Sequence, residues 1–88
     1  MLKITTRTDA TGTILDLEGK LMGPWVEELK RCWGEAVKTE RRIKVQLNAV
    51  TFIDHAGKRL LAEMHRQGAE LAAEGCMTKA ITEEIKRG

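Results

Sequence analysis

The spacing of the apolar residues changes period along this chain of 88 residues, and that change constrains the fold more than any other feature. In residues 2–6, and again in residues 13–17, apolar and polar side chains alternate, which is typical of half-buried strands. Residues 24–37 carry apolar residues at helical spacing, and residues 43–53 return to a strand pattern. A second helical stripe runs from about residue 56 to residue 67. Strands that alternate with helices predict a partly parallel sheet, whereas the opening hairpin predicts an antiparallel pair.

We therefore predict an α/β protein with a small mixed four-stranded sheet and about three packed helices. A chain of this length fits a single domain, residues 1–88. The assignment of the fourth strand stays open, because residues 69–73 can alternate as a strand or can extend the preceding helix. Thr78 can cap a third, short helix whose apolar side carries Ile81 and Ile85.

The composition narrows the classes of function. The net charge of +2 arises from 15 basic and 13 acidic residues that are interleaved along the chain, so no stripe for nucleic acid is expected. No signal peptide and no membrane-inserted segment is expected either, and two isolated cysteines, Cys32 and Cys76, fit a reducing cytoplasm. Two scattered cysteines and two histidines, His55 and His65, make a poor metal site, so we expect no metal and no cofactor.

The most informative stretch is VTFIDHAG, from Val50 to Gly57, where a strand pattern gives way to a helical one. Asp54 is predicted to be the N-cap of the helix, with its carboxylate accepting from backbone N–H groups two or three residues later. His55 would then be the first helical residue with an exposed side chain, and Ala56 and Gly57 would keep the turn uncluttered. Open α/β folds often place ligands at such a junction. A plain capped helix with a surface histidine is the alternative.

The stretch around this junction resembles the central part of STAS domains, the sulfate-transporter and anti-sigma-factor-antagonist family. Those domains show a strand, then V-x-F-I-D-S-(S/T)-G, then a helix with paired leucines and a glycine. The matching residues here are Val50, Phe52, Ile53, Asp54, Gly57, Leu60, Leu61 and Gly68. The upstream TILDLEGKL is similar to the family's second strand, and the likeness runs from about Thr13 to Leu71.

The resemblance implies a bacterial signalling protein that acts in the regulation of transcription by binding a protein partner. In regulatory members a serine follows the aspartate, and a partner kinase that is itself an anti-sigma factor phosphorylates it, which adds nearly two negative charges at the contact surface and repels the partner. His55 occupies that position here and Ala56 the next, so the phosphorylation switch is expected to be lost. The residues expected to bind the partner are Asp54, His55, Ala56, Gly57 and Lys58.

Several alternatives stay open at the level of sequence. The partner can be an anti-sigma factor, a kinase-like regulator or a transporter subunit, and the chain can form a homodimer. A STAS-like domain can instead bind a nucleotide or an anion, because Lys58 and Arg59 follow a helix N-terminus. An enzyme is not expected, since no nucleophile accompanies His55 and Asp54 at a useful spacing. His65 is predicted to be a surface residue.

Overall fold

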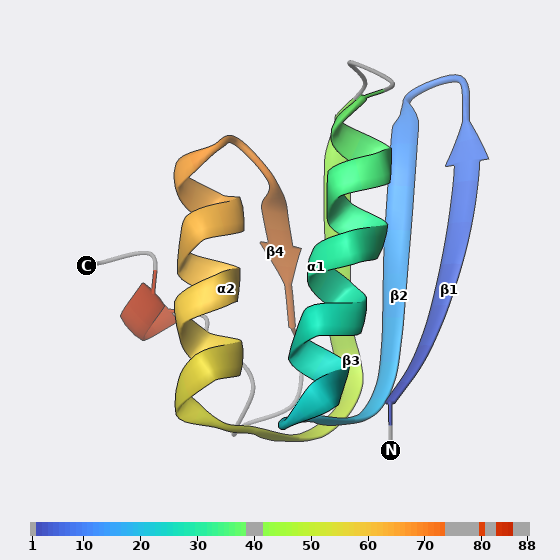
Figure 1. Ribbon diagram of the computed structural model, residues 1–88. Coiled ribbons are helices and arrows are strands. Elements are labelled where there is room, and N and C mark those ends of the chain that lie inside the picture. Colours follow the sequence, from blue (N-terminus) through green and yellow to red (C-terminus); the bar gives the residue numbers. More distant parts are fainter. Residues whose placement is uncertain (1, 39–41, 74–79, 81–82, 86–88) are drawn as a thin grey trace.

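The computed structural model describes residues 2–38, 42–73, 80 and 83–85. Figure 1 shows the order of the elements, which is β1 (Leu2–Asp9), β2 (Gly12–Leu21), α1 (Pro24–Val37), β3 (Ile43–Ile53), α2 (His55–Arg66) and β4 (Glu70–Ala72). Residues 83–85 belong to a further helical segment. The predicted α/β class, with a four-stranded sheet and three packed helices, is confirmed.

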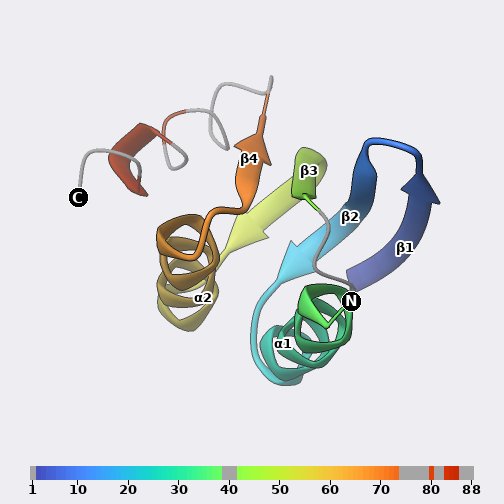
Figure 2. The same ribbon diagram turned by 90° about the horizontal axis from the view of Figure 1, so that it is seen from above.

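The sheet is mixed, as the sequence predicts. Its strand order is β1-β2-β3-β4, with β1 antiparallel to β2, and with β3 parallel to both β2 and β4. The hairpin between β1 and β2 turns at Asp9, whose Oδ1 accepts hydrogen bonds from the backbone N–H groups of Thr11 and Gly12. Helices α1 and α2 lie on the same face of the sheet (Figure 2). Two layers therefore enclose the core.

The core lies between that sheet face and the two helices, and it is almost entirely aliphatic. Alternate residues of β2, and of β3 from Ile43 to Leu47, are buried in it, whereas beyond Leu47 the register shifts between the two strands interrupt the alternation in β3. Helices α1 and α2 contribute residues at helical spacing. The largest side chains that are fully buried are Leu15, Leu17, Leu21, Leu29, Leu47, Leu61, Met64 and Val45. Trp33 is the one aromatic side chain in this cluster of buried residues, within the described part of the chain.

The open question about residues 69–73 is answered by the sheet. Gly68 has a positive φ of 99°, which ends the run of helix, and β4 follows at once. Val45 of β3 pairs with Leu71, and both side chains are buried. Of the predicted third helix, Thr78 and Ile81 lie outside the described residues, whereas Ile85 packs partly buried against the core. No described helix is both long enough and apolar enough to span a bilayer.

Candidate functional site

The parallel pairing of β2 and β3 brings two strand-to-helix junctions to the same edge of the sheet. Leu21 and Ile53, the last residues of the two strands, are paired in register. Helix α1 begins at Pro24 and helix α2 at His55, so both helix N-termini lie at this edge. The predicted junction is therefore one half of a larger structure, whose other half is the connection from β2 to α1.

Asp54 joins the two halves. Its Oδ1 accepts a hydrogen bond of 2.7 Å from the backbone N–H of Gly57, which confirms the predicted N-cap. Its Oδ2 accepts a hydrogen bond of 3.0 Å from the backbone N–H of Gly23, and its own backbone N–H donates to the carbonyl oxygen of Leu21 at 3.1 Å. Hydrogen bonds from Gly57 and Gly23 hold the pKa of the Asp54 carboxyl below its usual range, because they favour the charged form. The carboxylate therefore fixes both connections.

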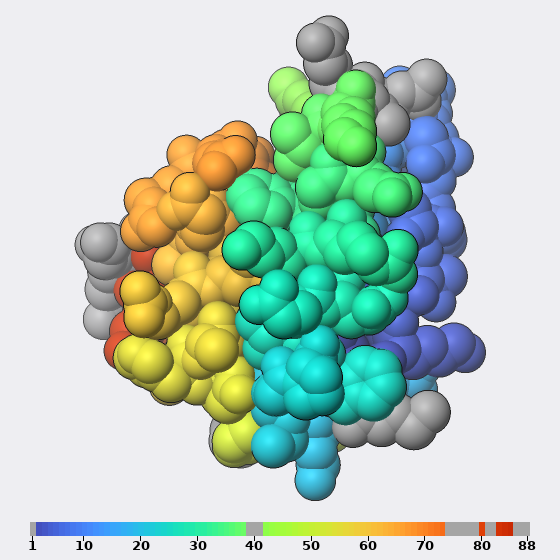
Figure 3. All heavy atoms as spheres, in the orientation of Figure 1, coloured from blue at the N-terminus to red at the C-terminus, as the bar shows by residue number. Residues whose placement is uncertain are grey.

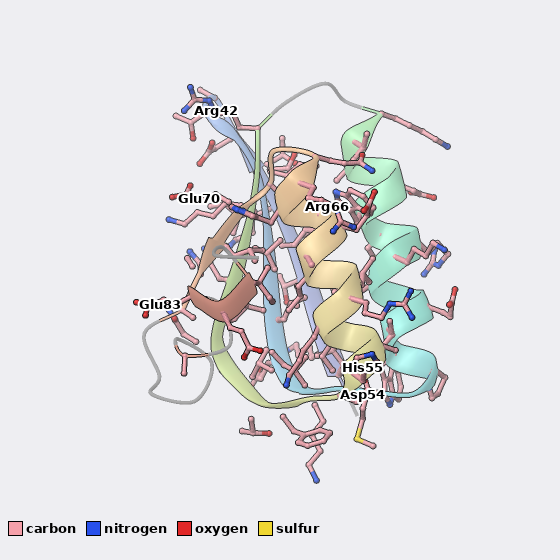
Figure 4. All side chains as sticks on the ribbon, turned by 90° about the vertical axis from the view of Figure 1, so that its left-hand side faces the viewer. Arg42, Asp54, His55, Arg66, Glu70 and Glu83 are labelled. Atoms are coloured by element: carbon pink, nitrogen blue, oxygen red, sulfur yellow. The ribbon has the colours of Figure 1, made fainter. Side chains whose placement is uncertain are left out.

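His55 is the first residue of α2 and is exposed, as the sequence predicts. Figure 4 shows His55 and Asp54 together at one end of α2, with Arg66 at the other end. Ala56 is also exposed, and Lys58 is half-buried. These three residues are accessible to a partner.

Gly57 is placed differently from its neighbours, because it is buried and faces the core. A Cβ atom at this position would lie 3.0 Å from the carbonyl oxygen and from the Cγ of Leu21, and 3.0 Å from the Cγ2 of Ile53. The close approach that this glycine permits is thus between α2 and the end of β2. Gly57 shapes the junction, and its backbone N–H serves the Asp54 cap.

Replacing Gly57 with alanine is expected to lower the free energy of unfolding by about 1–2 kcal/mol, since the added methyl group presses on a backbone oxygen that cannot rotate away. Gly34 is the matched control, because it also lies within a helix but has no atom within 4 Å of the equivalent Cβ. Gly34→Ala is expected to raise the free energy of unfolding by up to about 1 kcal/mol, through helix propensity alone. Urea unfolding of both variants measures the contrast, and stabilisation by Gly57→Ala would contradict the close contact.

Two exposed apolar side chains flank the junction, and sequence reasoning did not assign them to the site. Met22 is 39 % exposed and Phe52 is 43 % exposed. Met22 follows Leu21 on the connection from β2 to α1, and Phe52 precedes Ile53 within β3, so both lie at the edge of the sheet where Asp54 ties the two junctions together. A large apolar residue on the outward side of a strand end was the available signal for Phe52. Met22, Phe52, His55 and Lys58 around Asp54 are called the junction surface below.

A groove of about 600 Å³ runs from the junction surface between α1 and α2, whose surfaces lie side by side in Figure 3. Its apolar lining includes Val26, Trp33 and Leu60, which are all buried. Charged side chains of both signs complete the lining: Glu27, Lys30, Arg59, Glu63 and Arg66. The sequence could not place this groove, because it depends on how the two helices pack together.

Among the residues that the structure describes, no three His, Cys, Asp or Glu side chains could hold a metal ion together. The prediction of a surface histidine at position 65 is only half right, since His65 is half-buried and its Nδ1 is shielded from solvent with no partner among those residues. Arg66 forms an ion pair with Glu63, and this hydrogen-bonded contact lowers the pKa of the Glu63 carboxyl.

Comparisons with known proteins identify the fold and the family. None of the curated proteins compared with this sequence matches it. A solved structure described as "Crystal Structure Analysis of Mglu" is similar in fold, with a TM-score of 0.64 and 21 % sequence identity over 81 % of this chain, which spans 19 % of that one. The family model of the STAS domain matches residues 2–85. The chain therefore belongs to the STAS domain family.

Proposed function

We propose that residues 1–88 form one non-catalytic domain that works as a bacterial cytoplasmic signalling module and binds a regulatory protein through the junction surface and helix α2. STAS domains generally mediate protein–protein interactions, as anti-sigma antagonists or as parts of transporters. The anti-sigma antagonist type, with an anti-sigma factor or kinase-like regulator as its partner, is the one we propose here.

The observation that carries this proposal is the pair of exposed apolar side chains, Met22 and Phe52, beside the exposed His55. Phe and Met are enriched in the buried cores of protein interfaces, and groups that are ordered before binding lose less entropy when the complex forms. Here the hydrogen bonds of Asp54 hold both connections. The surface is thus ordered in the free domain.

We further propose that this surface is not switched by phosphorylation at position 55. His55 and Ala56 stand where regulatory family members carry hydroxyl residues, and neither has a hydroxyl group. The interaction would then be controlled by the amount of partner or by competition. Peptide mass spectrometry after incubation with ATP and source lysate tests this point, because fragmentation locates an added phosphate, and a phosphate on residues 54–58 would contradict it.

His55→Glu is expected to reduce capture of the partner from the source lysate at least about tenfold, because it puts a negative charge in the centre of the junction surface. Thr6→Glu is the matched control, since Thr6 is exposed on β1, away from both junctions, and gains the same charge. Quantitative mass spectrometry of the captured proteins gives the ratio for each variant. Equal capture by His55→Glu and the unchanged protein would remove the junction from the interface.

Binding of a small anion or nucleotide, in a ligand-binding or transporter-accessory role, is the second candidate. The α1–α2 groove favours it, because three cations line the groove: Arg59 near the N-terminus of α2, Arg66 at the other end of that helix, and Lys30 from α1. Thermal unfolding with a panel of nucleotides and inorganic anions tests this role. A rise in Tm with one of them would favour it, whereas no response across the panel would leave the protein-binding role.

A further inference from the structure

One side of helix α2 is a cationic face that extends the junction surface along the helix. It consists of His55, Lys58, Arg59, Ala62, His65 and Arg66, which recur at intervals of three or four residues and so share one side. All six residues line a single hollow of about 590 Å³. From His55 to Arg66 the face is roughly 16 Å long, at 1.5 Å per residue.

The charges of this face are incompletely balanced within the described part of the chain. Arg66 is paired with Glu63, but no ion pair or hydrogen bond to a side chain involves Lys58 or Arg59 there. Lys58 ends the first turn of α2 and Arg59 begins the second. The first turn contains no acidic residue, and the carboxylate of the N-cap, Asp54, already accepts from the backbone N–H groups of Gly57 and Gly23. Cations at this end of a helix oppose the helix dipole, at a small cost in free energy. An acidic group from outside the helix would remove that cost.

The domain itself shows the chemistry of a suitable occupant. The far wall of the hollow is formed by Glu84 and Ile85, from the helical segment that lies on the side of α2 away from α1 (Figure 1). Glu84 is exposed and brings a carboxylate to the side of the cations, while Ile85 is partly buried against the core. The hollow thus has the cations on one wall, a carboxylate on the other, and aliphatic surface from Ala62 and Ile85.

We propose that the cationic face binds an acidic segment of the regulatory partner, with carboxylates against Lys58 and Arg59 and an aliphatic side chain in the hollow beside Ala62 and Ile85, and that the like charge of Glu84 on the far wall weakens this binding. This inference rests on the proposed function and adds the chemistry of the partner. A protein segment fits better than a nucleic acid or a membrane, because the face is short and offers the small Ala62 and the aliphatic Ile85 as a place for an apolar side chain.

The test uses a fluorescein-labelled peptide of glutamates interspersed with leucines, titrated with the full chain in low-salt buffer. The double variant Lys58→Glu/Arg59→Glu is expected to weaken binding at least about tenfold, because like charges then face the peptide. Lys3→Glu/Lys38→Glu is the matched control, with the same change in net charge at exposed residues on β1 and at the end of α1. Glu84→Gln is expected to tighten binding by about twofold, because the exposed carboxylate on the far wall then no longer repels the peptide. Circular dichroism verifies that each variant is folded.

The outcomes test the acidic partner segment separately from the proposed function. No binding of the peptide, equal loss in both double variants, or binding of phosphatidylglycerol vesicles or inorganic pyrophosphate in place of the peptide would overturn the inference. If the peptide does not bind while capture of the lysate partner still depends on His55, the proposed function stands and the proposal of an acidic partner segment is wrong. If the peptide binds at Lys58 and Arg59 while capture ignores His55→Glu, the acidic recognition stands and the junction surface is not the partner site.

Discussion

Replacing Leu61 with alanine is expected to lower the free energy of unfolding by about 2–5 kcal/mol, the range found for large-to-small changes at buried leucines. Leu61 has no exposed surface and belongs to the buried cluster between α2 and the sheet. A small domain has a total stability of about 5–15 kcal/mol, so this one change removes a large share of it. Urea unfolding followed by the fluorescence of Trp25 and Trp33 measures the effect.

Val37→Ala is the matched control for this prediction. Val37 is an aliphatic residue at the end of α1, but it is 43 % exposed, so its truncation is expected to change the free energy of unfolding by less than about 0.5 kcal/mol. If Leu61→Ala were as mild as Val37→Ala, α2 would not pack against the sheet through Leu61. The position of the junction surface depends on that packing, since α2 carries His55 and Lys58.

Replacing Gly12 with alanine is expected to cost about 2–5 kcal/mol, through two effects that add. Its φ of +150° is a conformation that residues with a side chain rarely adopt, and a Cβ atom would lie 2.4 Å from the carbonyl oxygen of Arg42. That oxygen cannot move away easily, because it accepts a hydrogen bond of 2.7 Å from the backbone N–H of Thr13. Insertion of a methyl group therefore forces apart the start of β2 and the residue before β3.

Gly68→Ala separates the two effects. Gly68 also has a positive φ, of 99°, but nothing lies within 4 Å of a Cβ atom at that position. Its replacement is expected to cost about 1–3 kcal/mol, from backbone strain alone. A larger loss of stability in Gly12→Ala than in Gly68→Ala, measured by the same urea titration, would show the steric contact. Equal losses would mean that Gly12 and Arg42 are farther apart than the structure has them.

Local patterns were enough to predict most of the elements. The helix expected at residues 24–37 has those bounds, because Pro24 can only begin a helix and the apolar stripe ends at Val37. The cap at Asp54 and the exposure of His55 were also predictable, since both depend on residues within one turn.

Residues 69–73 show where local preference fails. Ala, Glu and Leu favour helix, yet residues 70–72 form a strand, because the open side of β3 offers hydrogen bonds and a buried place for Leu71. An edge of this kind exists only once β2 and β3 have paired. Residues 70–72 thus form a strand because they pair with β3, more than because of their own conformational preferences.

The candidate site divides in the same way. The sequence alone determined that a capped helix begins at Asp54 with His55 outward, because capping and helix periodicity act over a few residues. Only the tertiary structure decided that Gly23 shares the Asp54 carboxylate, that Met22 and Phe52 flank the same edge, and that Glu84 faces the cationic side of α2. The residues involved lie far apart in the sequence; Gly23 and Asp54, for example, are separated by 31 positions. The register of the parallel strands and the packing of the helices bring them together in space.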